Sequence, residues 1–353
     1  MHATCGRARS LSLPSNSVTT PRCLLRRSHT RAVATLVAAS FGLVVAAIPQ
    51  VPAAGVSRQD GTGIATTKLT LVDTTRPTPA TPGKRAQKRR ELETTIRYPE
   101  SAVGPLPLIV LAHGSNGTPE DLDELMNTWA GAGYVVAAPL FPRVNVDRHG
   151  NAIPSEVAQF PADLSFVISQ VVRLGGSSAS GPLQGRVDAR AIGAGGISLG
   201  GMSVYGLISN TCCRDDRVGA AILMGAVRPD FPRGKYTRQR VPVLLVHGDA
   251  DIGYHWSTST YPHLAPPKWF ITLRHGRHGP PFEDEPDEHD DLVNATTTAF
   301  WDRYLKGDLA AADRIVADVH GSGDLATLER DLGGSRGRAG SRLPVFGPNG
   351  VTG

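Results

Sequence analysis

The sequence predicts an α/β fold in which a mostly parallel central sheet is covered by helices on both faces. Continuous apolar runs at residues 106–112, 241–246 and 269–273 are typical of strands that are buried on both sides. Segments with helical periodicity, such as residues 163–174, alternate with these runs. Alternation of this kind needs crossover connections, which produce parallel strands.

The remaining elements follow in order along the chain. Strands are expected at residues 68–72, 93–98, 106–112, 134–139, 190–197, 219–224, 241–246 and 269–273. Helices are expected at residues 119–132, 163–174, 202–208 and 290–305. Residues 141–161 have no regular pattern, and we expect them to shape the rim of a site. The chain from residue 321 onward is rich in Gly, Ser and Arg, which predicts a flexible tail.

The first 53 residues are predicted to be an export signal. Arginines at positions 22, 26, 27 and 31 precede an apolar run from 32 to 48, and a small-residue cleavage site follows. The run is slightly short for a membrane span, so cleavage is favoured over a permanent membrane anchor. The predicted organisation is an export signal (1–53), a linker (54–66), a catalytic domain (67–320) and a flexible tail (321–353). We therefore expect a protein that is secreted or held in the cell envelope.

The net positive charge of the chain, +5 at pH 7, comes entirely from the predicted export signal. Residues 1–53 hold six of the 37 Lys and Arg residues and none of the 32 Asp and Glu residues, which leaves a net charge of about −1 for the rest. The charge balance therefore gives no reason to expect a nucleic-acid partner. Cys212 and Cys213 are the cysteines that follow the signal, and they could form a vicinal disulfide or remain thiols. Their spacing does not fit a zinc site.

A Gly-x-Ser-x-Gly motif is the most informative feature for function. Ser198 lies between Gly196 and Gly200, after a strand-like run and before a helix-like one. This context is that of a nucleophile elbow, a tight turn that exposes a serine above a sheet. A second match at residues 333–337 has no apolar run on either side, so we assign it to the tail. Ser198 is therefore the candidate nucleophile.

A serine nucleophile needs a histidine base, and the histidine needs an acid to orient it. On this architecture the acid and then the histidine follow the serine in the chain. The strand at 241–246 delivers Asp249 and Asp251, and we choose Asp251 because Asp249 is well placed to hold the turn. The loop after the last strand carries His275 and His278; we choose His278 as the base and keep His275 as the alternative.

The tetrahedral oxyanion of such a reaction needs two backbone N–H donors. Leu199 follows the nucleophile at the start of a helix and is the first candidate. The loop after residues 106–112 supplies the second, for which we choose Ser115, with Asn116 close behind.

At these residues the chain resembles the α/β-hydrolase superfamily over essentially its whole length after the signal. Within the superfamily it is similar to secreted bacterial serine esterases related to dienelactone hydrolases, polyester hydrolases and platelet-activating-factor acetylhydrolases. The matching residues are 71–77, 113–115, 163, 196–201, 212–215, 247–251 and 278–281. The resemblance implies the fold, ester hydrolysis without a cofactor, and a triad of Ser198, Asp251 and His278. Dienelactone hydrolases use cysteine as nucleophile, so Ser198 argues against that activity.

The expected function is a serine esterase that forms an acyl-enzyme on a small-molecule, lipid or polymer ester. No large insertion resembles a lid, which favours short or soluble acyl groups. The alternatives are a polyester depolymerase or lipid acetylhydrolase on the same triad, with Tyr254, His255 and Trp256 lining a groove, and a non-catalytic binding protein. We expect a monomer with no cofactor, no bound metal and no membrane insertion after signal cleavage.

Overall fold

The computed structural model describes residues 56–58, 63–81, 83–143, 154–226 and 234–333. The chain divides into two units, Met1–Gln50 and Val51–Gly353, and every described residue belongs to the second. The predicted export signal lies outside the described residues. Within the described residues no helix is both long and apolar enough to cross a membrane.

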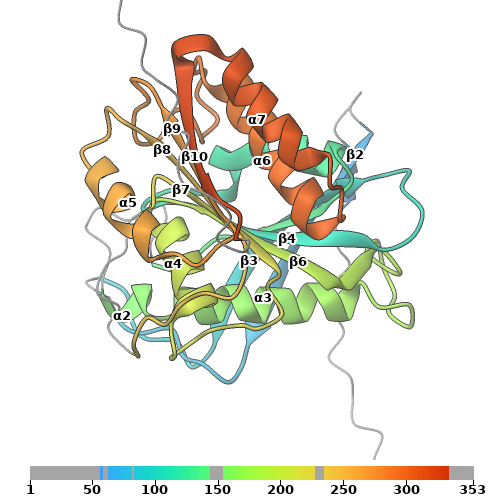
Figure 1. Ribbon diagram of the computed structural model, residues 1–353. Helices are drawn as coiled ribbons and strands as arrows, with labels where there is room; N and C mark the ends of the chain where they lie inside the picture. Colours follow the sequence, from blue (N-terminus) through green and yellow to red (C-terminus); the bar gives the residue numbers. More distant parts are fainter. Residues whose placement is uncertain (1–55, 59–62, 82, 144–153, 227–233, 334–353) are drawn as a thin grey trace, which may run out of the picture. The chain divides into compact units, whose positions relative to one another are not determined.

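One mixed sheet of ten strands organises the described part of the chain (Figure 1). Its order is β1-β2-β3-β5-β4-β6-β7-β8-β9-β10, and the strands from β5 through β9 in this order pair in parallel. The strands are β1 (Val56–Arg58), β2 (Ile64–Asp73), β3 (Arg90–Pro99), β4 (Leu106–Ala112), β5 (Val135–Pro139), β6 (Val187–Ile197), β7 (Ala220–Met224), β8 (Val243–Gly248), β9 (Lys268–Leu273) and β10 (Ala326–Asp331). The prediction of a mostly parallel α/β sheet is therefore confirmed.

Helices cover both faces of this sheet, as the sequence predicts. In Figure 1, α6 and α7 lie on one side of the sheet and α3 on the other. The helices are η1 (Pro119–Leu122), α1 (Asp123–Gly131), α2 (Pro154–Val157), α3 (Phe160–Leu174), α4 (Leu199–Ser209), α5 (Tyr254–Thr260), η2 (Tyr261–His263), α6 (Asp290–Leu305), α7 (Ala311–Gly321) and η3 (Gly323–Leu325).

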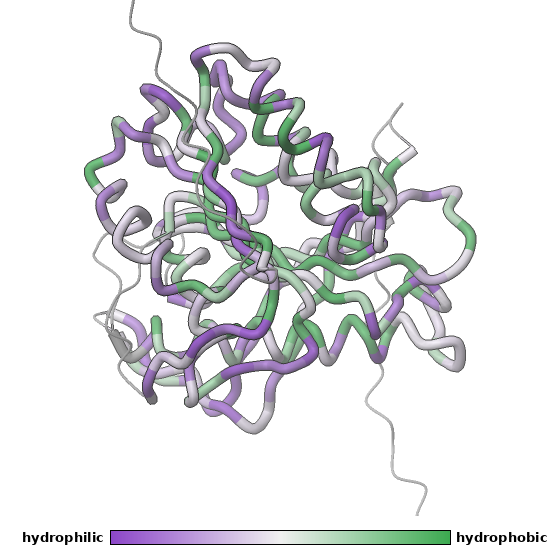
Figure 2. The backbone as a smooth tube through the Cα atoms, in the orientation of Figure 1, coloured by the Kyte–Doolittle hydropathy of each residue, from purple (hydrophilic) through white to green (hydrophobic). Residues whose placement is uncertain are grey.

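Each central strand supplies side chains to two hydrophobic cores, one on each face. In β4, Leu108 and Val110 belong to the core that α3 and α4 cover, whereas Ile109 and Leu111 belong to the core under α1, α6 and α7. Successive side chains of a strand point to opposite faces, so a strand buried on both sides must be apolar throughout. Figure 2 shows this pattern as green strands in the middle of the molecule.

The C-terminal region differs from the predicted tail. Residues 326–331 form β10, which pairs antiparallel with β9 at the edge of the sheet. Most side chains of β10 are exposed, so its stability comes from backbone pairing and it carries little apolar pattern. Helix α7 was also not predicted, although Ala311, Ile315 and Val319 repeat every four residues and are buried. Residues 334–353 lie outside the described residues.

The region expected to be irregular contains a short helix. Helix α2 occupies Pro154–Val157, and α3 begins at Phe160, three residues earlier than predicted. Residues 144–153 of this region lie outside the described residues. Cys212 and Cys213, which follow α4, form a disulfide.

Candidate active site

Ser198 lies in a tight turn between β6 and α4. Its backbone has a φ of 52° and a ψ of −116°. Residues other than glycine adopt this conformation only when the surrounding structure enforces it. A Cβ atom on Gly200 would lie 2.1 Å from the carbonyl oxygen of Ala112, and one on Gly196 would lie 2.5 Å from the carbonyl carbon of Gly200. Both glycines are therefore required by close backbone packing, and the packing holds the Ser198 turn in place.

His278 and Asp251 extend the site from two neighbouring strands. Asp251 follows β8 and His278 follows β9, so both lie at the carboxyl edge of the parallel strands. Nε2 of His278 lies 2.8 Å from Oγ of Ser198, and its Nδ1 is hydrogen-bonded to Oδ2 of Asp251. The structure thus brings Ser198, His278 and Asp251 into one hydrogen-bonded row, and it brings them from segments that are far apart in the sequence.

Asp249 and His275, the alternatives for the acid and the base, lie outside this row. Oδ1 of Asp249 accepts a hydrogen bond from the backbone N–H of His275 at 2.6 Å. His275 has a positive φ of 58° and an exposed side chain. The two residues therefore hold the β8 and β9 loops together. A Cβ on Gly248 would lie 2.0 Å from the carbonyl oxygen of Gly276, so the two loops touch backbone to backbone.

Three donors surround the carboxylate of Asp251. Its Oδ1 accepts from the N–H of Gly253 at 2.7 Å, and its Oδ2 contacts both His278 and Nε2 of His247, the latter at 2.7 Å. Burial by itself would raise the pKa of Asp251, but the hydrogen bonds from Gly253, His278 and His247 outweigh burial and lower the pKa. Asp251 is therefore a charged acceptor at neutral pH.

His247 is a further member of the site that was not among the predicted site residues. Its side chain is fully buried at the end of β8, and burial lowers its pKa, so the neutral ring is favoured. Oγ of Ser257 lies 2.6 Å from Nδ1 of His247 and 2.9 Å from the carbonyl oxygen of Ala226. The available signal was position, because His247 lies one residue before the end of β8 and four residues before Asp251.

His247, Asp251 and His278 also form a group that could ligate a metal, since their ligand atoms all lie within 4.8 Å of one another. Both imidazole rings point a nitrogen at the same oxygen of Asp251. Hydrogen bonding therefore explains why the three side chains lie together, and we assign no metal to them.

The two predicted oxyanion donors belong to segments that lie close to Ser198. Leu199 is the first residue of α4, and N–H groups in the first turn of a helix have no acceptor within the helix. Ser115 is exposed in the loop after β4, and a Cβ on the preceding Gly114 would lie 3.5 Å from Cβ of Ser198. The structure thus places both segments beside Ser198, while their part in catalysis stays a prediction.

His113 fixes the peptide that carries the Ser115 N–H. Its ring is buried, and Nδ1 lies 2.8 Å from the carbonyl oxygen of Gly114, while Nε2 accepts from the N–H of Phe141 at 3.0 Å. Burial lowers the pKa of His113 to about 4, so the ring is neutral at pH 7 and donates from Nδ1. The oxygen of Gly114 and the N–H of Ser115 belong to one planar peptide, so this hydrogen bond orients that N–H.

The aromatic residues after Asp251 have different surroundings. Tyr254 is hydrogen-bonded to Oγ1 of Thr272 at 2.9 Å, and its ring packs edge-on against His247. Trp256 is 47% exposed, and Ile252, the residue directly after Asp251, is 92% exposed. Tyr254 is therefore a packing residue, whereas Ile252 and Trp256 present apolar surface beside the acid.

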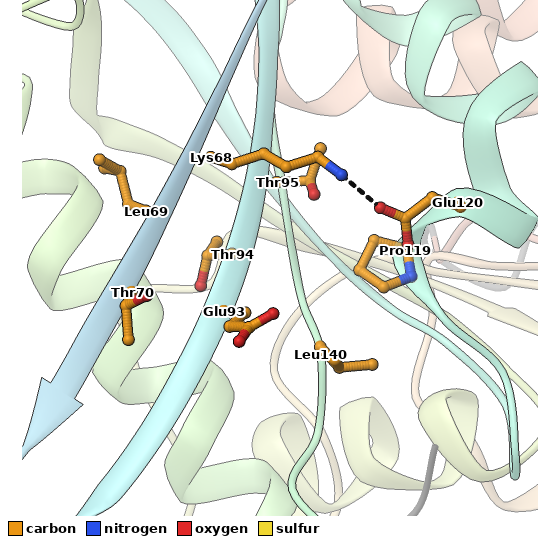
Figure 3. A pocket seen from close by; sticks show the side chains of 9 residues that line it. All are labelled: Lys68, Leu69, Thr70, Glu93, Thr94, Thr95, Pro119, Glu120 and Leu140. Atoms are coloured by element: carbon orange, nitrogen blue, oxygen red, sulfur yellow. Dashed lines mark hydrogen bonds and ion pairs between the residues drawn. The ribbon is translucent and has the colours of Figure 1, made fainter. Parts of the chain in front are cut away.

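A separate pocket of about 150 Å³ lies over β2, β3 and the start of η1 (Figure 3). Its lining includes none of Ser198, Asp251 and His278. Across it, Lys68 donates to Oε1 of Glu120 at 2.6 Å. Two of its charges are therefore paired with each other, and we assign it no role.

Compared with known proteins, the chain matches no family model, and no curated protein is significantly similar to it in sequence.

Proposed function

We propose that this protein is a serine hydrolase that cleaves carboxylic esters, with Ser198 as nucleophile. The observation that carries the proposal is the hydrogen-bonded row from Ser198 Oγ through both ring nitrogens of His278 to Oδ2 of Asp251. A hydroxyl is a weak nucleophile, and this arrangement is the one that lets an imidazole take its proton during attack. Ser198 is half-buried at the carboxyl end of the central strand β6, and we propose that a substrate carbonyl reaches it there.

The proposed reaction has two halves. Ser198 attacks the ester carbonyl while His278 Nε2 takes the hydroxyl proton, and the N–H groups of Leu199 and Ser115 stabilise the oxyanion. His278 then passes the proton to the leaving alcohol, which produces an acyl-enzyme. In the second half a water molecule attacks the acyl-enzyme with His278 as base, and the acid product leaves. Throughout, the Asp251 carboxylate stabilises the imidazolium that forms.

The order Ser198, Asp251, His278 along the chain also supports membership of the α/β-hydrolase superfamily. From the predicted export signal we also propose that the protein acts outside the cytoplasm. We further propose that it is a monomer and needs no cofactor. Its ester substrate is a small molecule, a lipid or a polymer.

Hydrolysis of p-nitrophenyl esters from acetate to palmitate tests the proposal. We expect the purified protein to cleave the short esters fastest, and Ser198→Ala to lower kcat by at least about a thousandfold with the fold intact. Ser177→Ala, which changes an exposed serine in a loop, is the matched control and should keep the wild-type rate. Equal activity of Ser198→Ala and the wild type would exclude Ser198 as nucleophile.

A second candidate, a depolymerase or lipid acetylhydrolase, is favoured by the exposed side chains of Ile252 and Trp256. Apolar side chains this exposed beside a reactive site suit a substrate that is presented as an apolar surface. Ile252→Ser should then slow hydrolysis of an insoluble polyester film more than that of soluble p-nitrophenyl acetate. If Ile252→Ser slows hydrolysis of the film and of p-nitrophenyl acetate equally, an esterase acting on soluble substrates is the better description.

A further inference from the structure

A carboxyl group outside the hydrogen-bonded row lies beside the candidate active site. The N–H groups of Phe282 and Glu283 both donate to the carbonyl oxygen of Gly279, at 2.8 and 3.1 Å. Residues 279–283 therefore form a tight turn directly after His278. This turn carries the side chain of Glu283 back toward the histidine.

The distances from two glycines, Gly279 and Gly114, locate the Glu283 carboxyl. A Cβ on Gly279 would lie 2.7 Å from Oε2 of Glu283, and a Cβ on Gly114 would lie 3.9 Å from Oε1. The same Cβ on Gly114 would lie 3.5 Å from Cβ of Ser198. The carboxyl thus occupies the gap between the loop of His278 and the loop after β4, next to the nucleophile.

Among the described residues, the Glu283 carboxyl has no hydrogen-bond or ion-pair partner. It is half-buried, and the charged groups that act on it are Asp121, His278 and Glu285. Burial raises the pKa of Glu283, the negative charge of Asp121 raises it further, and His278 opposes both. The carboxyl therefore lacks a compensating cation of its own, beside the place where a substrate must bind.

We propose that Glu283 makes the enzyme prefer esters whose alcohol group carries a positive charge. The inference rests on the proposed esterase function and specifies its substrate class. The leaving alcohol receives its proton from His278, so it must lie on the side of the site that His278 and Gly279 form. Glu283 lies on that side. A cationic alcohol group would supply the charge that the carboxyl lacks, whereas an anionic one would be repelled.

Two esters of matched shape test this preference. Acetylcholine and 3,3-dimethylbutyl acetate have the same acyl group and nearly the same size, but only acetylcholine is charged. The quantity to measure is the ratio of kcat/KM for the charged ester to kcat/KM for the neutral one. We expect Glu283→Gln to lower this ratio by about 3- to 30-fold, the range for unit charges several ångströms apart with partial screening. Glu288→Gln removes an exposed carboxylate of the same loop and should leave the ratio within about twofold of the wild type.

The outcomes separate the inference from the function on which it rests. A wild type that cleaves 3,3-dimethylbutyl acetate, with the same ratio in Glu283→Gln, would overturn the role of Glu283 and leave the esterase standing. A wild type that cleaves neither of these acetates nor any p-nitrophenyl ester would overturn the function and the inference together. If Glu283→Gln does not fold, Glu283→Met provides a second uncharged side chain of similar length, and the same fall in the ratio is expected.

Discussion

His247 and His278 contact the same oxygen atom, Oδ2 of Asp251. His278 reaches it from the loop after β9 and is half-exposed, whereas His247 reaches it from the end of β8 and is fully buried. The buried ring of His247 contacts the carboxylate within the core, while the half-exposed ring of His278 faces Ser198. Asp251 is thus positioned by a histidine that is itself fixed in the core, in addition to the N–H of Gly253.

This relationship predicts that His247→Leu impairs catalysis as well as stability. The change leaves a buried lone pair of Asp251 without its donor, so we expect the free energy of unfolding to fall by about 1–3 kcal/mol. A carboxylate that is held less firmly orients His278 less well, and kcat should fall about tenfold. Ser257→Ala removes only the outer contact of His247 and should cost less in both measurements. An unchanged kcat in folded His247→Leu would contradict this role.

The two aspartates of the β8 loop should respond differently to amidation. Asp251→Asn removes the charge that stabilises the His278 imidazolium, and kcat should fall by about 10³- to 10⁴-fold. In Asp249→Asn the side-chain oxygen that accepts from the N–H of His275 remains, so kcat should change less than about threefold. Steady-state kinetics on p-nitrophenyl acetate measure both. A larger loss of kcat in Asp249→Asn than in Asp251→Asn would mean that Asp249 is the acid and Asp251 is not.

Gly200→Ala should destabilise the protein strongly. The added methyl group would lie 2.1 Å from the carbonyl oxygen of Ala112, and neither backbone can move without disturbing the sheet. We expect a loss of at least about 3 kcal/mol in the free energy of unfolding. Gly321→Ala is the matched control, because a Cβ there meets nothing within 4 Å, and it should change stability by less than about 1 kcal/mol. Denaturant unfolding followed by circular dichroism compares the two.

Because His113 is buried, we expect the free energy of unfolding to fall in acid. In the folded protein its pKa is lowered to about 4, whereas in the unfolded chain it lies at the ordinary value of 6.5. Between these values the unfolded chain binds more protons, so stability falls as the pH falls through this window and is fully present above about pH 6.5. The shift corresponds to about 3 kcal/mol. Unfolding measured from pH 7 to pH 4 should show a weaker pH dependence in His113→Gln than in the wild type.

A control for that experiment is His263→Gln, which changes an exposed histidine of η2. It should retain the pH dependence of the wild type. Identical curves for His113→Gln and the wild type would mean that other groups cause the loss of stability in acid.

The sequence predicts the sheet well because its central strands are buried on both faces. A strand such as β4 must then be apolar at every position, and that pattern is visible without any tertiary information. The same argument fails for β10, whose side chains are mostly exposed and whose place depends on pairing with β9. Edge strands of this kind are determined by a neighbour far away in the sequence.

The candidate site likewise contains residues that the sequence indicates and residues that it does not. Ser198 could be found from its two glycines, since the turn needs them for steric reasons. The choice of His278 over His275 is matched by a hydrogen bond to Ser198 that the sequence could not show. His247 could be found only by its position, four residues before Asp251. The contact of Glu283 depends on how separate loops pack, because its carboxyl lies against Gly114. Such contacts leave no local pattern in the sequence.

The proposal that Ser198 is a nucleophile activated by His278 can be tested most directly by covalent labelling. The purified protein would be treated with a fluorophosphonate, and the modified residue located by mass spectrometry of its peptides. We expect one label per chain, on Ser198, with labelling lost in Ser198→Ala and slowed at least about a hundredfold in His278→Ala. An unlabelled wild-type protein, or a label on a different serine, would contradict it.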